Sequence, residues 1–474
     1  MDSPTRLDAQ ERLLWTAAAV AIAGSSLLLG LRWETTLWLF PALAVLGFGA
    51  LVLYRLPASG LTALIVGFPL VAGYEAGLQA GEVAYALFAV AYFGSWFGLR
   101  LFVYREPMLQ MSTDWVLGLF LLGASTSWML SALLGGPVTI ASAISEWKSL
   151  VPLAIYFPVQ ETIRRRQNGL HIVVGAAFTL GLFLLLRNAI LFRELITQAT
   201  ETWQVTRGRI SLNEALILAP ALGALVPAIA TPSRGLRWAW LAGAALFFAG
   251  LIMTQSRGFW VDYAVGVLVL VALAPWAWKR RLVLYGVFVG VSSLLLGWFL
   301  LGPVFELLWA GLLNRALSIF TSTSQDISLI NRFYEARAAM ELAGQNPVLG
   351  WGLGTELRAN DVIRDGAYTR VFIHNGYIGL WLKTGVWGVV LMAAFWGGAI
   401  WRGVRAYRSD APLFPRLCAL ASALVLFSLL PSVSTSTPFF TEDQMLLVGL
   451  LGGMAAGLSA RHAAPPADST PDAS

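Results

Sequence analysis

Apolar runs of about 20 residues follow one another along most of this chain, separated by short polar segments. A helix needs about that many consecutive apolar residues to cross a bilayer, so each run predicts one membrane-spanning helix. The sixth run is the weakest, because Pro152 and Pro158 interrupt it. We count about 14 spans on this length criterion, near residues 13–31, 36–54, 57–74, 82–103, 115–134, 147–160, 169–190, 212–230, 236–254, 258–276, 281–302, 374–400, 413–431 and 440–459. The pattern predicts an all-α, polytopic bundle of transmembrane helices.

Basic residues mark one side of this bundle. Cytoplasmic loops of membrane proteins carry an excess of Lys and Arg, and the basic groups here fall in alternate loops if every predicted span crosses. These groups are Arg55, Arg100 with Arg105, Arg164 to Arg166, Arg234 with Arg237, Lys279 to Arg281, and Arg402 with Arg405, Arg408 and Arg416. Both termini are therefore expected in the cytoplasm, and omission of the sixth span would scramble the alternation.

Two loops on the opposite, outer side are long, near residues 188–211 and 303–373. The second contains an amphipathic pattern over Leu329–Gly344, ended by helix breakers up to Pro347. A GWGLG loop follows, but no predicted strand precedes it, so a dinucleotide site is a weak interpretation. The chain thus divides into spans 1 to 11 (1–302), a mostly helical loop domain (303–373), spans 12 to 14 (374–459) and a disordered cytoplasmic tail (460–474).

Composition supports a membrane protein and excludes other classes. Hydrophobic residues make up 57% of the chain and charged residues 12%, about half the charged fraction of a soluble domain. The net charge of +6 is spread over many loops, so no basic stripe for nucleic acid forms. The lone Cys418 excludes a disulfide within one chain, and three scattered histidines are too few for a His-rich metal site.

Arginines on the outer side work against the insertion bias, so they are candidates for binding an anion. We expect Arg358, Arg364 and Arg370 instead to pair with carboxylates of the folded loop; the candidate partners are Glu335, Glu341, Glu356, Asp361 and Asp365.

Three other residues stand where inward-running helices are predicted to begin. Arg209 precedes the capping-box pattern Ser211–Glu214, Arg257 opens the tenth span, and His374 opens the twelfth. Helix N-termini present free N–H groups and the positive end of the helix dipole. Arginine adds a two-pronged donor, so these three ends predict a site for an anion such as a diphosphate.

Less specific interpretations remain open for the same residues. An arginine at a membrane rim often extends to lipid headgroups, and a lone histidine is often structural. We assign supporting roles to Ser256, Asn375 and Asp262, of which Asp262 can simply pair with a polar group on another helix. The outer loops contain no DxD, HExxH or paired carboxylates at catalytic spacing, so transfer chemistry here should need neither a metal nor a cofactor.

Several segments together resemble the O-antigen ligase and polymerase superfamily of bacterial envelope enzymes. They are TQSRGFW (254–260), INRFYEARAAMELAGQNPVLGWGLG (330–354) and HNGYIGLWLKTGVWG (374–388). The segment RISLN (209–213) is similar to the family's Arg-x-Ser-x-x-Asn pattern but is one residue shorter. The motifs cover roughly residues 207–400, and the first 160 residues match only as generic spans. Their order and their positions between the spans make the resemblance fairly specific.

The resemblance implies a GT-C-like membrane glycosyltransferase in the bacterial inner membrane, with the 303–373 domain in the periplasm. The donor would be a glycan on undecaprenyl diphosphate, used in lipopolysaccharide or other polysaccharide biosynthesis. Residue by residue, it implies that Arg209, Arg257 and Arg332 bind the diphosphate and that His374 is the catalytic base. Ligases, polymerases and protein O-oligosaccharyltransferases share these motifs, so the acceptor can be lipid A–core, a glycan or a protein.

The main alternative is a transporter or flippase of lipid-linked glycans. A transporter should place polar groups near the membrane midplane and show internal repeats, neither of which this sequence makes evident. A peptidoglycan-type polymerase would be expected to use an acidic group in the outer loop, and a non-catalytic scaffold is a third alternative.

Overall fold

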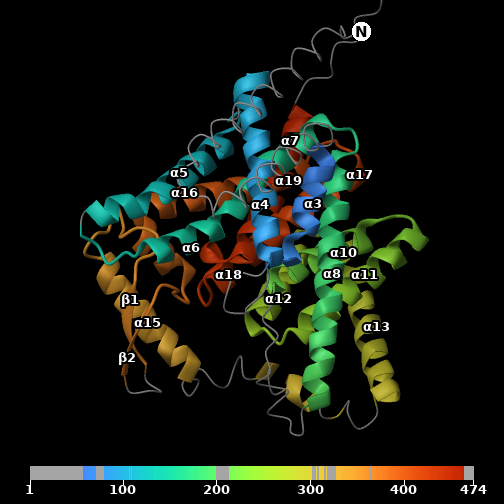
Figure 1. Cartoon of the computed structure of the whole chain (residues 1–474). Coiled ribbons are helices and arrows are strands. Elements are labelled where there is room, and N and C mark those ends of the chain that lie inside the picture. The colour runs from blue at the N-terminus through green and yellow to red at the C-terminus, as the bar shows by residue number, and fades with distance from the viewer. Residues whose placement is uncertain are drawn as a thin grey trace, which may run out of the picture. The chain divides into compact units, whose positions relative to one another are not determined.

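The computed structural model describes residues 57–70, 80–105, 107, 109–133, 135–198, 213–301, 306, 309–313, 316, 317, 327–361 and 366–463 (Figure 1). The chain divides into two compact units, Met1–Gln110 and Met111–Ser474. The first two predicted spans, 13–31 and 36–54, lie outside the described residues.

The first unit contains α3 (Pro57–Val66), the short turn η1 (Phe68–Leu70), α4 (Ala80–Gly98) and its π-helical continuation η2 (Leu99–Tyr104). Helix α3 has 10 residues, fewer than the predicted span 57–74 needs. The Tyr85 hydroxyl of α4 donates to the Leu64 carbonyl of α3 at 2.8 Å, which joins the two helices.

The second unit is a helical bundle with one small hairpin. Its helices in chain order are α5 (Ser112–Leu133), α6 (Ile140–Leu150), η3 (Val151–Ile155), α7 (Tyr156–Arg165), α8 (Gly169–Gln198), α10 (Glu214–Ala230), α11 (Arg234–Met253), α12 (Arg257–Leu273), α13 (Trp276–Leu301), α15 (Ile327–Ala343), α16 (Gly376–Tyr407), α17 (Leu413–Ser428), α18 (Leu430–Val433), η4 (Pro438–Phe440) and α19 (Glu442–Ala463).

The helices confirm a multi-pass membrane protein of the predicted class. Across the described part of the chain, 7 helices are long and apolar enough to cross a membrane. Helices α10 and α12 are apolar but have 17 residues each. Helix α19 continues to Ala463, so it includes the first residues assigned to the tail, and residues 464–474 lie outside the described residues. The count of about 14 spans and the orientation of the termini stay predictions.

The weak sixth predicted span packs closely against α19. The predicted run 147–160 is divided among α6, η3 and α7. Gly449, Gly453 and Gly457 of α19, spaced four residues apart, face this segment: a Cβ atom at these glycines would lie 2.7, 2.6 and 2.9 Å from backbone carbonyl oxygens of η3 and α7. Small residues at this spacing let two membrane helices approach closely. Glycine on α19 therefore accommodates the proline-interrupted segment.

We expect Gly453→Ala to destabilise the protein by about 1–3 kcal/mol, because the added methyl would overlap the Tyr156 carbonyl oxygen. Thermal unfolding of the detergent-solubilised protein measures this. The matched control is Gly397→Ala on α16, where a Cβ meets nothing within 4 Å. A Gly453→Ala variant that melts with or above Gly397→Ala would show that this face is not tightly packed.

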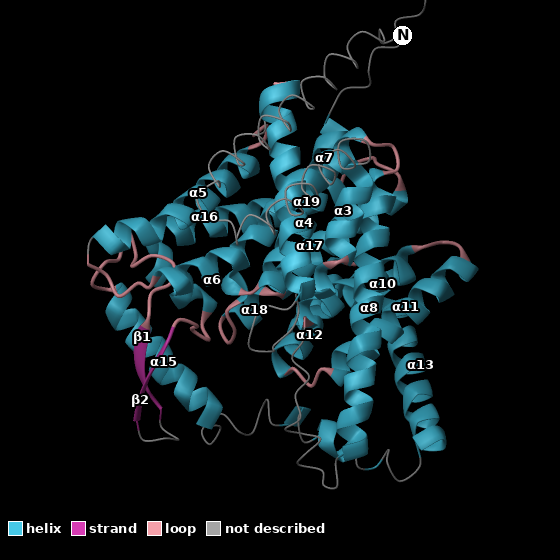
Figure 2. Cartoon of the chain, viewed as in Figure 1, coloured by secondary structure: helices cyan, strands magenta, loops and turns pink. Residues whose placement is uncertain are grey.

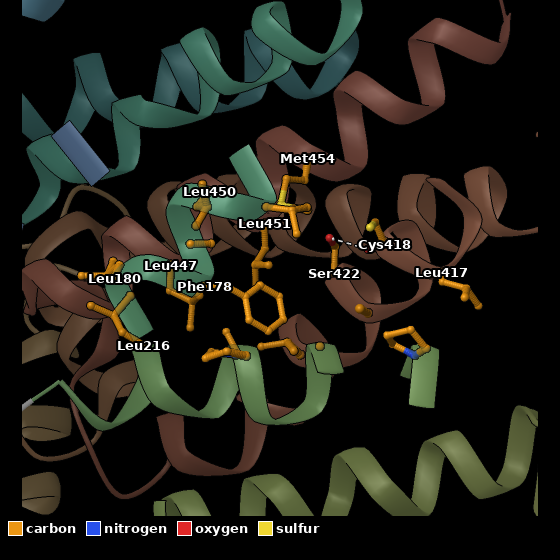
Figure 3. Close-up of a pocket in the computed structure, with 18 of the residues that line it drawn as sticks. Phe178, Leu180, Leu216, Leu417, Cys418, Ser422, Leu447, Leu450, Leu451 and Met454 are labelled. Carbon is orange, nitrogen blue, oxygen red and sulfur yellow. Dashed lines mark hydrogen bonds between the residues drawn. The ribbon is translucent and has the colours of Figure 1, made fainter. Parts of the chain in front are cut away.

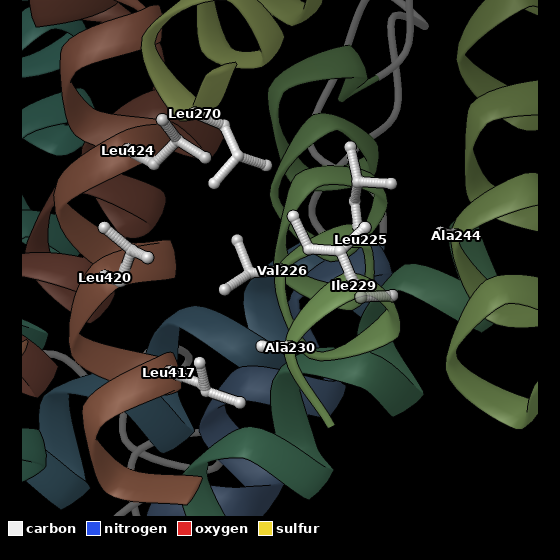
Figure 4. Packing of buried hydrophobic residues seen from close by; sticks show 10 residues of the cluster. Leu225, Val226, Ile229, Ala230, Ala244, Leu270, Leu417, Leu420 and Leu424 are labelled. Carbon is white, nitrogen blue, oxygen red and sulfur yellow. The ribbon is translucent and has the colours of Figure 1, made fainter. Parts of the chain in front are cut away.

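An apolar core joins α10, α11, α12 and α17 (Figure 4). Leu225, Val226 and Ile229 of α10 meet Leu270 of α12 and side chains of α17, which are Leu417, Leu420 and Leu424. This core fixes α12, the helix that begins with Arg257, against α10 and α17.

The 303–373 loop contains a feature that the sequence analysis did not predict. The expected helix is present as α15, ending at Ala343, next to the predicted breaker. After the glycine loop, strands β1 (Leu357–Asp361) and β2 (Gly366–Arg370) pair antiparallel with Leu357 opposite Arg370. This hairpin is the magenta element beside α15 in Figure 2. It leads the chain directly to His374.

Candidate active site

His374 lies in the short connection between β2 and α16. The next residue, Asn375, is the N-cap of α16, and its Oδ1 accepts the Ile378 N–H at 3.1 Å. Asparagine suits this position because its side chain satisfies an amide that the first helical turn leaves unpaired. The supporting residue Asn375 thus fixes where the helix begins, and thereby the backbone from which the His374 ring projects.

The His374 ring is held by Glu335 of α15, a contact that the sequence analysis did not predict. The Glu335 side chain is 1% exposed, and its Oε2 lies 2.9 Å from His374 Nδ1. Its other oxygen, Oε1, accepts the His374 backbone N–H at 3.0 Å. A carboxylate can only accept, so Nδ1 carries the proton of the neutral ring and Nε2 keeps its lone pair. The arrangement suits a base that acts through Nε2.

Arg370 partly balances the charge of this carboxylate. Its Nη1 donates to Glu335 Oε2 at 3.3 Å and lies 3.4 Å from His374 Nδ1. The expectation that Arg370 pairs with a loop carboxylate is therefore confirmed. The Phe372 ring contacts the imidazole edge-on, with 5.0 Å between ring centroids. The acidic partner is buried, whereas the histidine and Arg370 remain partly exposed, 30% and 34%.

Arg332 lies one helical turn before Glu335 on α15. Its Nη1 donates to the Thr435 carbonyl at 2.9 Å. Residues three apart on a helix share a face, so α15 presents Arg332 and Glu335 to the same side. The structure therefore brings two predicted residues, Arg332 and His374, to one face of the loop domain.

A polar segment, residues Ser432–Thr437, includes the end of α18, leads to η4 and connects the site to other helices. We call it the hydroxyl segment, because all but one of its residues are Ser or Thr. Its Thr437 hydroxyl donates to the carbonyl of Ile373, directly before His374. The role of this segment was not predicted, although a hydroxyl-rich stretch between two apolar spans is visible in the sequence.

The hydroxyl segment also contacts α12. The backbone N–H of Ser432 donates to Asp262 Oδ1 at 3.2 Å, and Asp262 is fully buried. A Cβ at Gly258 would lie 3.9 Å from the Thr435 hydroxyl. The supporting residue Asp262 therefore pairs across helices, and the start of α12 lies beside the segment that binds Arg332.

Arg257 is the first residue of α12, as predicted. Ser256 is the N-cap, but its side chain makes no cap hydrogen bond. A turn at Gln255, with φ 54°, precedes it, and the Thr254 hydroxyl accepts the Ser256 N–H at 3.3 Å. The Arg257 side chain is partly exposed. The local geometry thus places this arginine at a helix N-terminus.

The third predicted arginine, Arg209, lies outside the described residues. The capping box expected at Ser211–Glu214 does not match the helix. Helix α10 begins at Glu214 itself, after an N-cap Asn213 with φ 58° and no side-chain cap bond. A glutamate at the first helical position cannot complete a capping box, which needs it three residues after the cap.

The GWGLG loop docks into a break in α16. Gly385 has φ 67° and ψ −174°, so the helix is interrupted there. The N–H groups of Trp351 and Gly352 donate to the carbonyls of Leu382 and Lys383 at 2.7 and 2.9 Å. The loop glycines have positive φ, and side chains there would overlap neighbouring backbone. These glycines therefore serve close packing, not nucleotide binding.

The second unit also contains an apolar cavity between α8, α10, α17 and α19 (Figure 3). Phe178, Leu216, Leu451 and Met454 are among its lining residues, and the lining includes no charged side chain. Such a cavity suits a hydrocarbon chain and not a diphosphate.

Among the residues that the structure describes, no group of three or more His, Cys, Asp or Glu could hold a metal ion.

Residues 242–393 match the family model described as O-antigen ligase. The matched range includes Arg257, Arg332, Glu335 and His374, and it supports the resemblance to the O-antigen ligase and polymerase superfamily. No curated protein matches the chain.

Proposed function

We propose, from the O-antigen ligase domain that this membrane protein carries over residues 242–393, that it transfers a glycan from undecaprenyl diphosphate to an acceptor hydroxyl on the periplasmic side of the inner membrane. The acceptor is lipid A–core, a growing glycan or a protein. The observation that carries the proposal is the His374–Glu335 contact, at 2.9 Å, within the matched domain.

In the proposed reaction, Nε2 of His374 takes the proton from the acceptor hydroxyl as its oxygen attacks the anomeric carbon. The bond between that carbon and the diphosphate oxygen breaks, and undecaprenyl diphosphate leaves with the electron pair. Glu335 stabilises the imidazolium that forms, through the hydrogen bond to Nδ1. Direct displacement of this kind inverts the anomeric configuration.

Arginines supply the charge that the leaving diphosphate needs. Arg257 at the start of α12 combines a guanidinium with the positive end of a helix dipole, and both favour an anion. Arg332 is placed on the same face of α15 as Glu335, and we assign Arg209 to the same role. The isoprenoid tail is hydrocarbon, and an apolar lining such as that of the cavity beside α10 suits it.

The proposal is tested by transfer with purified protein, a synthetic undecaprenyl diphosphate glycan and several acceptors. We expect product in at least one reaction, and the same rate after exhaustive chelation, because arginines replace the cation at the phosphates. Loss with EDTA and rescue by Mg²⁺ or Mn²⁺ would indicate a metal-dependent transferase. Movement of the donor across vesicles without any product would favour a flippase.

We expect Arg257→Ala to lower turnover by about ten- to a hundredfold, since a hydrogen bond to a charged group contributes roughly 1.5–3 kcal/mol. Arg257→Lys should recover only part of it, because lysine lacks the two-pronged donor. The matched control is Arg358→Ala on β1, an exposed arginine of the loop domain. Equal rates for Arg257→Ala and Arg358→Ala would remove Arg257 from the site.

A further inference from the structure

A buried ion pair joins α6 to α16. Lys383 of α16 and Glu146 of α6 are 0% and 7% exposed, and the Lys383 ammonium contacts Glu146 Oε1. Burial of two charges is costly, so such a pair persists only where further hydrogen bonds satisfy both groups. Both groups have such partners here.

The partners of Glu146 lie in the glycine loop. Its second oxygen, Oε2, accepts the Gly354 N–H at 2.7 Å. The loop and the start of α6 are joined again at Thr355, which forms a bridge with Val138, and by the Glu356 N–H, which donates to the Pro137 carbonyl at 2.9 Å. Glu146 thus fixes the loop that docks into the break of α16.

The partners of Lys383 lie beside the histidine. Its ammonium donates to the Val371 carbonyl at 2.9 Å, three residues before His374, and lies 4.8 Å from the centre of the Phe440 ring. Phe440 belongs to η4, which follows the hydroxyl segment. The Lys383 ammonium therefore contacts both the segment that carries His374 and η4, which follows the hydroxyl segment.

We infer that Glu146 and Lys383 are positioning residues, which set the place of His374 by tying its backbone segment to α6. The catalytic consequence rests on the proposed function, but the positioning itself does not. The pair is directional: the side chain at 146 must accept from the Gly354 N–H, and the side chain at 383 must donate to the Val371 carbonyl.

The test combines two measurements on the full-length protein. The first is the rate at which diethyl pyrocarbonate modifies His374, followed by mass spectrometry of its peptide. The second is kcat and KM for the donor. The variants are Lys383→Met, Glu146→Gln and the reversed pair Glu146→Lys with Lys383→Glu. The control is Lys148→Met, which breaks the exposed ion pair of α6 with Glu442 at 2.9 Å, where Lys148 is 53% exposed.

We expect Lys383→Met and Glu146→Gln each to change the modification rate of His374 several-fold and to lower kcat by about ten- to a hundredfold, because small displacements of a reacting group are that costly. KM should stay near that of the wild type, and Lys148→Met should behave as wild type. The reversed pair restores charge balance but should not restore kcat.

Two results would overturn the inference. One is a modification rate in both single variants equal to that of Lys148→Met. The other is full recovery in the reversed pair, which would mean that only charge balance matters. If Lys383→Met does not fold, Glu146→Gln decides, since it keeps an acceptor for Gly354. The modification rate gives an answer even if the protein transfers no glycan, so failure of the proposed function and failure of this inference are distinguishable.

Discussion

His374→Ala should lower glycan transfer by about 10²- to 10⁴-fold, the usual contribution of a general base, while the donor still binds. The arginines hold the diphosphate in this scheme, so the loss lies in turnover. Wild-type turnover should also fall in acid, because an imidazolium cannot accept a proton. Donor affinity and turnover, measured separately across pH, check both expectations.

Two other roles for His374 give different results. If its imidazolium binds the diphosphate, the variant loses donor affinity, and acid leaves the wild-type rate unchanged or raises it. If the ring only packs against the loop, His374→Asn keeps most activity, and any loss follows protein stability. His171→Ala is the matched control, since His171 of α8 stacks on Phe414 at 5.1 Å between centroids and should keep full turnover.

Glu335→Gln should lower turnover by at least about tenfold, with an upper bound near the 10⁴-fold loss seen when the orienting carboxylate of a serine protease is neutralised. The amide retains the shape of Glu335 but not the charge that stabilises the imidazolium, and it can hold the wrong ring tautomer. The turnover rate of transfer, measured at saturating donor for the wild type and the variant, checks this expectation.

The chain offers a close control for this substitution. Glu341 lies on the same helix, is 67% exposed and pairs only with Arg337 four residues away among the contacts described, at 3.1 Å. Exposed pairs of this kind contribute little. Glu341→Gln should therefore match the wild type. A Glu335→Gln enzyme as active as Glu341→Gln would show that His374 does not depend on its carboxylate partner.

The parts of this fold that depend on local chemistry could be predicted from the sequence. The apolar runs predict helices because the bilayer sets their length. The end of α15 was expected near Gly344, and the start of α16 near His374, because breakers and caps act on their own neighbours. Arg257 was expected at a helix start for the same reason, and α12 begins there.

Contacts between distant segments could not be predicted. Glu335 is one of several carboxylates of its loop, and no periodicity indicates that it meets His374, 39 residues away. The hairpin was missed because its strands are short and polar, although Asp365–Gly366 is a turn signal. The capping box at α10 failed since its pattern fits more than one register, and the helix begins at Glu214.

The docking of the glycine loop into the break of α16 has a consequence for chain length. The Val386 N–H donates to the Pro347 carbonyl at 2.9 Å, beside the contacts of Trp351 and Gly352, so the chain between Pro347 and Val386 forms a closed ring. Within that ring, the bridge at Thr355 and the pairing of β1 with β2 fix most positions. Inserting or deleting residues next to Pro347 or Val386, where hydrogen bonds close the ring, would therefore displace His374 from its carboxylate partner Glu335.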